Sequence, residues 1–156
     1  MAPGALAAAV VVNEPPRRGD VGDVTAAADR PTGDERSEAS YAGDSWTRCG
    51  GCNVATGDRS YHYGYRAGQS FTLRFRGVQV LVYAPDDRFG GVAGVTVDGR
   101  PAAMPTVDFL TTGTPANRHV WDSGLLPDGE HTVVFTILPG RTDNVALFDR
   151  ADVFTP

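Results

Sequence analysis

The sequence contains no lysine, and all 14 of its basic residues are arginine. No fold requires arginine at every basic position, so we attribute the bias to a GC-rich genome and expect an actinobacterial origin. Acidic residues outnumber the arginines, and the formal net charge is −5 at pH 7. Because phosphate binding needs a basic surface, this charge argues against a nucleic acid as the main partner.

A hydrophobic run long enough to span a membrane is also missing. The apolar stretch at residues 5–12 is too short for that purpose, and it lacks the basic flank of a signal peptide. We interpret it as a strand and expect any export signal to lie outside this chain. No membrane partner is therefore predicted.

Only two cysteines are present, Cys49 and Cys52, in the sequence CGGC. A zinc site needs further ligands, and no second CxxC exists; a thioredoxin-like motif would need a βαβ context that is absent. We therefore predict a local Cys49–Cys52 disulfide, which fits a secreted, extracellular protein. Because the loop is so short, the bond contributes only about 2 kcal/mol in the chain-entropy model.

Helical periodicity, internal repeats and low-complexity tracts are all absent as well. Residues 71–76 and 78–82 alternate apolar with polar side chains, and we interpret the pair as a hairpin. Residues 92–97 form a third strand pattern, which the turn dipeptide at 98–99 closes.

Further strand patterns follow at similar spacing, and a chain of 156 residues suits a single domain. We predict strands at residues 35–42, 60–65, 101–111, 118–122, 131–138 and 145–154, with a long loop at 43–59. Many strands joined by turns indicate a β-sandwich. We assign residues 36–156 to the sandwich and residues 1–35 to an extension or linker with one or two added strands, at 5–12 and 24–28.

Four motifs resemble those of the accessory β-sandwich modules attached to secreted bacterial glycoside hydrolases. They are Tyr61-His62-Tyr63 before a strand, Val82-Tyr83 before a Pro/Asp loop, Val95-Thr96-Val97-Asp98-Gly99, and LLPDGEHTVVFTI at residues 125–137. The resemblance covers roughly residues 40–155 and implies an all-β, galactose-binding-domain-like jelly-roll fold. It also implies a non-catalytic carbohydrate-binding module that targets a linked glycoside hydrolase to its polysaccharide or glycan. The alternative is a structural or protein-interaction β-sandwich without a sugar site.

Because successive antiparallel strands alternate in direction, the parity of the strands sorts the loops into two ends. Loops at residues 64–68, 84–91, 112–117 and 139–144 are expected at one end. Loops at Gly77, 98–100, 123–129 and CGGC are expected at the other. The resemblance implies a ligand site at the first end.

The first group of loops is rich in side chains suited to sugars. Carboxylate, amide and guanidinium groups can bind hydroxyl pairs, while an aromatic ring packs against a C–H face. The candidate ligand-binding residues are Asp86, Asp87, Arg88, Asn117, Arg141, Asp143, Asn144 and Tyr65. Trp46, the better exposed aromatic, is a further stacking candidate in a loop expected at the opposite end; the alternative is that its ring folds over the end of the sandwich. Ordinary solvated turns have the same composition, and they are the alternative interpretation.

The other aromatic residues have two interpretations each. Tyr61 and Tyr63 project to one side of an extended segment, where they either form a stacking platform with Tyr65 or pack the core with their hydroxyls at its rim. We favour the core for these two tyrosines and for Trp121, and a hydrogen-bonded structural role for His62.

Catalytic constellations are not recognisable. The nucleophile elbow G-x-S-x-G is absent, and nothing singles out two carboxylates at the separation that a glycosidase needs. We therefore predict no catalytic residues, with a small lyase or esterase as the remaining alternative. Asp86 and Asp87 are also candidates for a structural Ca²⁺, although no ligand spacing is diagnostic.

Overall fold

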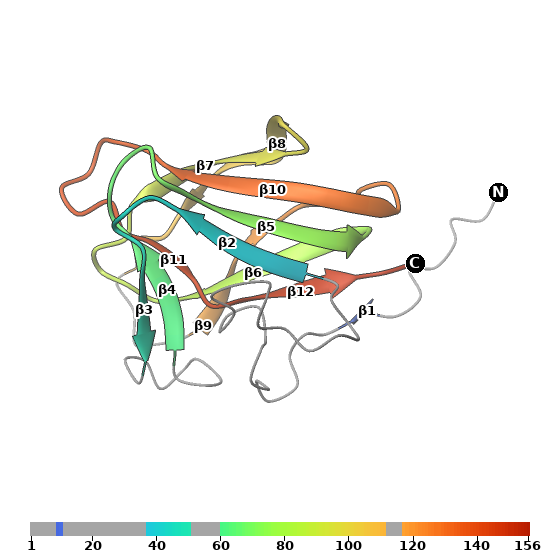
Figure 1. Ribbon diagram of the computed structural model, residues 1–156, viewed down its shortest axis with the longest axis horizontal. Coiled ribbons are helices and arrows are strands. Elements are labelled where there is room, and N and C mark those ends of the chain that lie inside the picture. The colour runs from blue at the N-terminus through green and yellow to red at the C-terminus, as the bar shows by residue number, and fades with distance from the viewer. Residues whose placement is uncertain (1–8, 11–36, 51–59, 112–116) are drawn as a thin grey trace.

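The computed structural model describes residues 9–10, 37–50, 60–111 and 117–156 (Figure 1). Strands and turns make up this part of the chain, which contains no helix. Consequently no helix of the described residues is long and apolar enough to cross a membrane.

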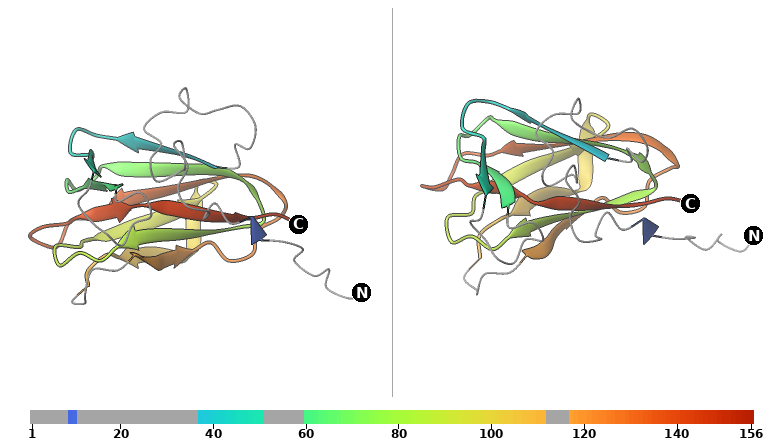
Figure 2. Two further views of the ribbon diagram at one scale, coloured as in Figure 1. Left: turned by 90° about the horizontal axis from the view of Figure 1, so that it is seen from below. Right: turned by 60° about the horizontal axis from the view of Figure 1, so that its bottom comes forward.

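The strands form three antiparallel sheets. The five-stranded sheet has the order β2 (Ser37–Ala42), β5 (Ser70–Gly77), β10 (Gly129–Ile137), β7 (Val92–Val97) and β8 (Arg100–Asp108). The four-stranded sheet has the order β1 (Ala9–Val10), β12 (Arg150–Phe154), β6 (Gln79–Pro85) and β9 (Asn117–Asp122). The three-stranded sheet has the order β11 (Ala146–Phe148), β4 (Ser60–Gly64) and β3 (Thr47–Gly50). Figure 2 shows β2 and β5 in one layer and β6 and β12 in the layer opposite.

The strand pairs are nested inside one another. β4 pairs with β11, β5 with β10, β6 with β9, and β7 with β8. Each pair encloses the next along the chain, and successive pairs belong to different sheets. The chain is thus wound like one long hairpin folded across two layers, which is the topology of a jelly roll. The predicted all-β jelly-roll sandwich is confirmed.

Aromatic rings at the centre of the molecule connect the two layers. Phe71 of β5 stacks on its cross-strand neighbour Phe135 of β10, with ring centroids 4.3 Å apart. Trp121 of β9 approaches Phe135 edge-on at 5.2 Å from the other layer. Its indole Nε1 donates a hydrogen bond of 2.8 Å to the carbonyl of Met104, so the buried polar atom has a partner. The predicted core position of Trp121 is confirmed.

The predicted hairpin between residues 71–76 and 78–82 is wrong. The two strands form, but β5 belongs to the five-stranded sheet and β6 to the four-stranded one. Gly77 and Val78 carry the chain from one layer to the other, and Val78 N donates to the carbonyl of Phe154 at 2.8 Å. Alternation indicates which side chains of a strand are buried, but two strands that bury alternate residues can face the same core from opposite sides.

Two other predicted segments are divided differently in the structure. The loop expected at residues 43–59 contains β3, and the strand expected at 145–154 is two strands, β11 and β12, separated at Asp149. Within residues 1–35, β1 pairs with β12 over two residues, whereas residues 24–28 lie outside the described part of the chain.

Replacing Phe71 by Ala should strongly destabilise the sandwich. The ring is fully buried at the centre of the core, and the free energy of unfolding should fall by about 3–5 kcal/mol because a cavity remains. Thr72→Ala is the control, since Thr72 lies on the outer face of the same strand and should cost about 1 kcal/mol or less. Urea unfolding of the two variants measures the difference, and equal losses would contradict this account of the core.

Candidate functional site

Three of the four loops that strand parity grouped at the first end lie together, whereas residues 112–116 of the fourth lie outside the described part of the chain. Gly91 N donates to the carbonyl of Val145 at 2.7 Å, and Val145 N donates to the carbonyl of Phe89 at 3.1 Å. Thr111 N donates to the carbonyl of Asp87 at 3.0 Å. We call this the loop end; it consists of residues 43–46, 65–69, 86–91, 109–111 and 139–145 and lies at the left of Figure 1.

Gly90 and Gly91 allow these loops to approach one another closely. A Cβ on Gly90 would lie 2.2 Å from the backbone of Phe109, and a Cβ on Gly91 would lie 2.5 Å from Cα of Asn144. Neither backbone can move away without breaking hydrogen bonds to its neighbours. The loop between β6 and β7 is therefore held between the end of β8 and the segment before β11.

Arg141 joins the same loops with its side chain. Its NH1 and NH2 donate to the two carboxylate oxygens of Asp108 at 2.5 and 2.7 Å, and NH1 also donates to the carbonyl of Gly90 at 3.1 Å. Asn144, at a φ of 42°, accepts a hydrogen bond of 3.0 Å from Arg141 N. Two predicted ligand residues, Arg141 and Asn144, thus stabilise the loops.

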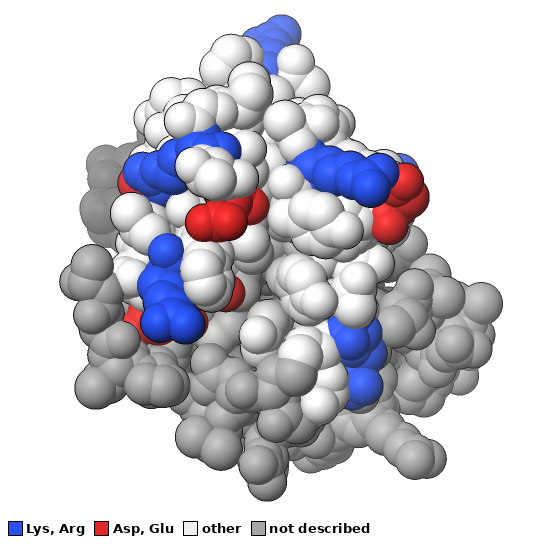
Figure 3. Space-filling view, turned by 90° about the vertical axis from the view of Figure 1, so that its left-hand side faces the viewer, with Lys and Arg blue, Asp and Glu red and all other residues white. Residues whose placement is uncertain are grey.

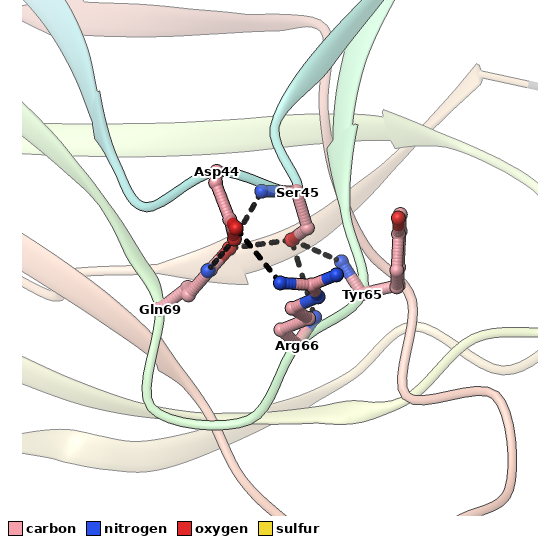
Figure 4. A network of polar contacts seen from close by, with 5 residues as sticks. All are labelled: Asp44, Ser45, Tyr65, Arg66 and Gln69. Carbon is pink, nitrogen blue, oxygen red and sulfur yellow. Dashed lines mark hydrogen bonds and ion pairs between the residues drawn. The ribbon is translucent and has the colours of Figure 1, made fainter.

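A second network fixes the turn between β2 and β3 against the loop before β5 (Figure 4). Ser45 Oγ accepts hydrogen bonds from the backbone nitrogens of Tyr65 and Arg66 at 3.0 and 3.2 Å, and Ser45 N donates to Gln69 Oε1 at 3.0 Å. Asp44 accepts from Gln69 Nε2 at 2.7 Å and from Arg66 NH1 at 2.8 Å. The pKa of Asp44 lies below its usual value, mainly because of the hydrogen bond from Gln69 and then because of the charge of Arg66. The ring of Tyr65 points away from this network and is 46% exposed.

Beside these loops, β4 presents two tyrosines on one face. Tyr61 and Tyr63 are half-buried, with ring centroids 6.2 Å apart. Burial, and then the negative charge of Asp87, raise the pKa of the Tyr61 phenol. Asp87 Oδ1 accepts a hydrogen bond of 2.7 Å from the backbone nitrogen of Phe89, whose ring is 46% exposed. We name Tyr61, Tyr63, Asp87 and Phe89 the tyrosine–aspartate surface.

The structure places most of the predicted site residues at the loop end. Asp86 and Asp87 are half-buried and Arg88 is exposed, with its guanidinium 5.0 Å from the centre of the Phe89 ring. Asp143 is exposed in the loop before β11. The backbone of Asn117 pairs with Pro85, while its side chain lies outside the described part of the structure.

Trp46 lies at a different end of the sandwich from the one predicted. The strand β3 follows it, so the turn that carries Trp46 lies at the loop end. Its ring is half-buried, 5.6 Å from Phe71 and 5.2 Å from Tyr41, and its Nε1 donates to the carbonyl of Ala42 at 3.2 Å, which agrees with the alternative that it folds over the sandwich. Trp46 therefore contributes to packing in this structure.

Three residues of this end were missing from the predicted ligand set. Tyr61 and Tyr63 were assigned to the core, and the ion-pair partner Asp108 was not singled out. Tyr61 and Tyr63 are two residues apart in a strand, so the sequence indicates that they share a face. Only the tertiary structure shows that this face stays partly open and that the charge of Asp87 acts on it.

Charges of both signs are distributed over the loop end. Figure 3 views the molecule from this side and shows acidic side chains next to several of the arginines. Two of these contacts are the pairs Arg141–Asp108 and Arg66–Asp44. Among the described residues, no group of three or more His, Cys, Asp or Glu side chains is arranged to hold a metal ion.

The second cysteine lies outside the described residues. Cys49 is half-buried in β3, directly opposite Tyr61 of β4. The predicted Cys49–Cys52 disulfide therefore stays a prediction.

Neither a protein-family model nor a curated protein matches the sequence. Among solved structures, the chain is similar to TmCBM61 in complex with beta-1,4-galactotriose, with a TM-score of 0.42 and 16% identity over 78% of this chain and 90% of that one. It is also similar to the catalytic domain of a GH87 alpha-1,3-glucanase in complex with tetrasaccharides (TM-score 0.40, 12% identity, 79% of this chain). The third is the Agl-KA catalytic domain (TM-score 0.37, 14% identity, 78% of this chain). The chain spans only 28% of the length of each of these two catalytic domains. Similarity at this level identifies no family and no ligand.

Replacing Gly90 by Ala should disturb the loop end. The new Cβ would meet the backbone of Phe109 and Leu110 at 2.2–2.3 Å, and such overpacking should cost about 1–3 kcal/mol. Gly129→Ala is the matched control, because a Cβ there meets nothing within 4 Å. Urea unfolding, with amide chemical shifts of residues 87–91 and 109–111, tests the expectation. Equal behaviour of the two variants would show that the close approach does not matter.

Proposed function

We propose that the protein is a non-catalytic carbohydrate-binding module and that its sugar lies on the tyrosine–aspartate surface. The observation that carries this proposal is the pair of half-buried rings of Tyr61 and Tyr63, 6.2 Å apart, together with the charge of Asp87, which acts on the Tyr61 phenol. A tyrosine ring can pack against the apolar C–H face of a sugar, while a carboxylate accepts hydrogen bonds from its hydroxyls.

The loop that carries Asp87 supports this role because it is held before any ligand arrives. Gly90 and Gly91 are enclosed by backbone on two sides, and Arg141 donates to the carbonyl of Gly90. A preorganised loop loses little conformational entropy on binding. We expect millimolar to micromolar affinity, roughly −4 to −8 kcal/mol, as suits a surface with few aromatic contacts.

Weak binding of this kind is useful when the module is linked to an enzyme. Retention on a polymer raises the effective concentration of a catalytic domain near its substrate. We propose that the module is part of an exported protein in which a linked glycoside hydrolase catalyses the hydrolysis of the polysaccharide.

The alternative is a structural or protein-interaction sandwich without a sugar site. It is favoured by the number of polar groups at the loop end that already have intramolecular partners. Arg141 is paired with Asp108, Arg66 is paired with Asp44, and one oxygen of Asp87 accepts from Phe89 N.

A glycan array followed by calorimetry with the best sugar tests the proposal. Asp87→Asn retains an oxygen that can accept from Phe89 N but removes the charge, so affinity should fall by about 1.5–3 kcal/mol. Tyr61→Ala removes one ring of the surface and should weaken binding at least about tenfold, or 1.4 kcal/mol. The control is Leu125→Ala, an exposed apolar residue between β9 and β10, which should leave affinity unchanged. If no sugar on a broad array binds, the structural or protein-interaction function replaces this one.

Mass spectrometry of the protein alkylated without reduction tests the proposed disulfide. Cys49 and Cys52 should both resist alkylation, and the tryptic peptide should be 2 Da lighter than the dithiol form because two hydrogens are lost. Reduction should lower the free energy of unfolding by no more than about 2 kcal/mol, since the closed loop is short. Recovery of two alkylated thiols would rule out the bond.

A further inference from the structure

At the end of the sandwich opposite the loop end, both ring nitrogens of one histidine face oxygen atoms. His131, at the start of β10, has only 7% of its surface exposed. Its Nδ1 lies 2.7 Å from Oδ2 of Asp98, and its Nε2 lies 2.7 Å from the carbonyl oxygen of Pro127. A carbonyl and an ionised carboxylate only accept hydrogen bonds, whereas a neutral imidazole donates from one nitrogen alone. Only the imidazolium makes both contacts favourable.

The carboxylate of Asp98 is held in its ionised form by the same arrangement. Its second oxygen, Oδ1, accepts a hydrogen bond of 2.8 Å from the backbone nitrogen of Thr132. Partial burial opposes ionisation, but the hydrogen bonds from His131 and Thr132 outweigh it and bring the pKa of Asp98 below its usual value. The shared proton therefore belongs to the histidine.

The ring connects two separate loops to β10. Asp98 occupies the turn between β7 and β8 at a φ of 50°, a left-handed conformation that aspartate adopts readily in an Asp-Gly hairpin turn. Pro127 belongs to the connection between β9 and β10, which crosses from the four-stranded to the five-stranded sheet. From β5, the ring of Phe75 packs against His131 with centroids 5.4 Å apart.

We propose that His131 is a proton-dependent clasp, which holds the β7–β8 turn and the β9–β10 connection together as imidazolium and releases the latter when it becomes neutral. The remaining proton of the neutral ring stays on Nδ1, where the charge of Asp98 attracts it. Nε2 then presents a lone pair to the carbonyl oxygen of Pro127 at 2.7 Å, and this contact has to open. The part of the chain released is Pro127 with Asp128, because Ser123 N and Leu126 N still donate to the carbonyls of Val80 and Val78.

The groups around the His131 ring determine whether the clasp opens as the pH rises or as it falls. Burial lowers the pKa of His131, but the hydrogen bonds to Asp98 and Pro127, with the charges of Asp98 and Asp128, outweigh it, and the pKa lies above its usual value. A group whose pKa is raised on folding contributes its full stability below the unfolded pKa, about 6.5, and loses it as the pH rises through the folded pKa. The clasp is thus closed in mildly acidic solution and opens toward alkaline pH.

Titration of the three histidine rings by NMR tests the proposal on the whole chain. His131, assigned with the variant His131→Phe, should titrate above the value of an unperturbed histidine, about 6.5. The amide signals of Leu126 and Asp128, which flank Pro127, should shift with the same midpoint. Asp98→Asn retains an acceptor for Thr132 N but removes the charge, so it should lower the midpoint of His131. A His131 midpoint at or below about 6.5, or one insensitive to Asp98→Asn, would overturn the clasp.

Thermal unfolding supplies an independent readout. The difference in Tm between the unaltered protein and Asp98→Asn should be largest near pH 5.5 and should shrink as the pH rises through the His131 midpoint. The control is Thr72→Ala on the outer face of β5, which removes no titrating group, so its Tm difference should show no such trend. A Tm difference for Asp98→Asn that does not change with pH would show that the pair is merely structural. Neither measurement on Asp98→Asn depends on the folding of His131→Phe.

Discussion

The architecture depends on the contact between the central strands β5 and β10. Eight residue pairs join them, from Gly129 opposite Gly77 to Thr136 opposite Ser70, and the inward positions carry the stacked rings of Phe71 and Phe135. Because the jelly roll is nested, this pair lies between the outer pair β4–β11 and the inner pairs of the winding. The rings fill the space that faces the second layer, where Trp121 packs edge-on. The strands of this central pair run to both ends of the sandwich, so their packing sets where the loops at each end begin.

Polar contacts hold the loops at both ends of the sandwich, but the side chains that make these contacts differ. At the loop end, bidentate Arg141 and the close backbone approach at Gly90 position the loop that carries Asp87. Guanidinium keeps its charge at every physiological pH, so these contacts do not respond to protons. At the other end His131 lies between Asp98 and the carbonyl of Pro127, and histidine is the side chain whose charge can change near neutral pH. The two ends therefore use groups that differ in their response to protons.

Several polar side chains of the loops hold other loops in this structure. Arg141 and Asn144 looked like sugar ligands because guanidinium and amide groups bind hydroxyls well, yet they bind other loops here. The same donor geometry suits a carboxylate of the chain and a sugar hydroxyl, so residue type alone does not separate the two uses. Tyr61 and Tyr63 pack against the core as predicted, and they also stay partly exposed.

The sequence by itself determined the strand class, the turn at Asp98-Gly99 and the grouping of loops by parity. These properties depend on neighbouring residues, through the alternation of side chains and the preferences of turns. The tertiary structure alone decided which sheet each strand joins, why β5 and β6 do not form a hairpin, and where Trp46 lies. It also decided that both nitrogens of His131 face acceptors and that the charge of Asp87 acts on Tyr61. Such contacts join residues far apart along the chain, and local patterns carry no information on which distant segments become neighbours.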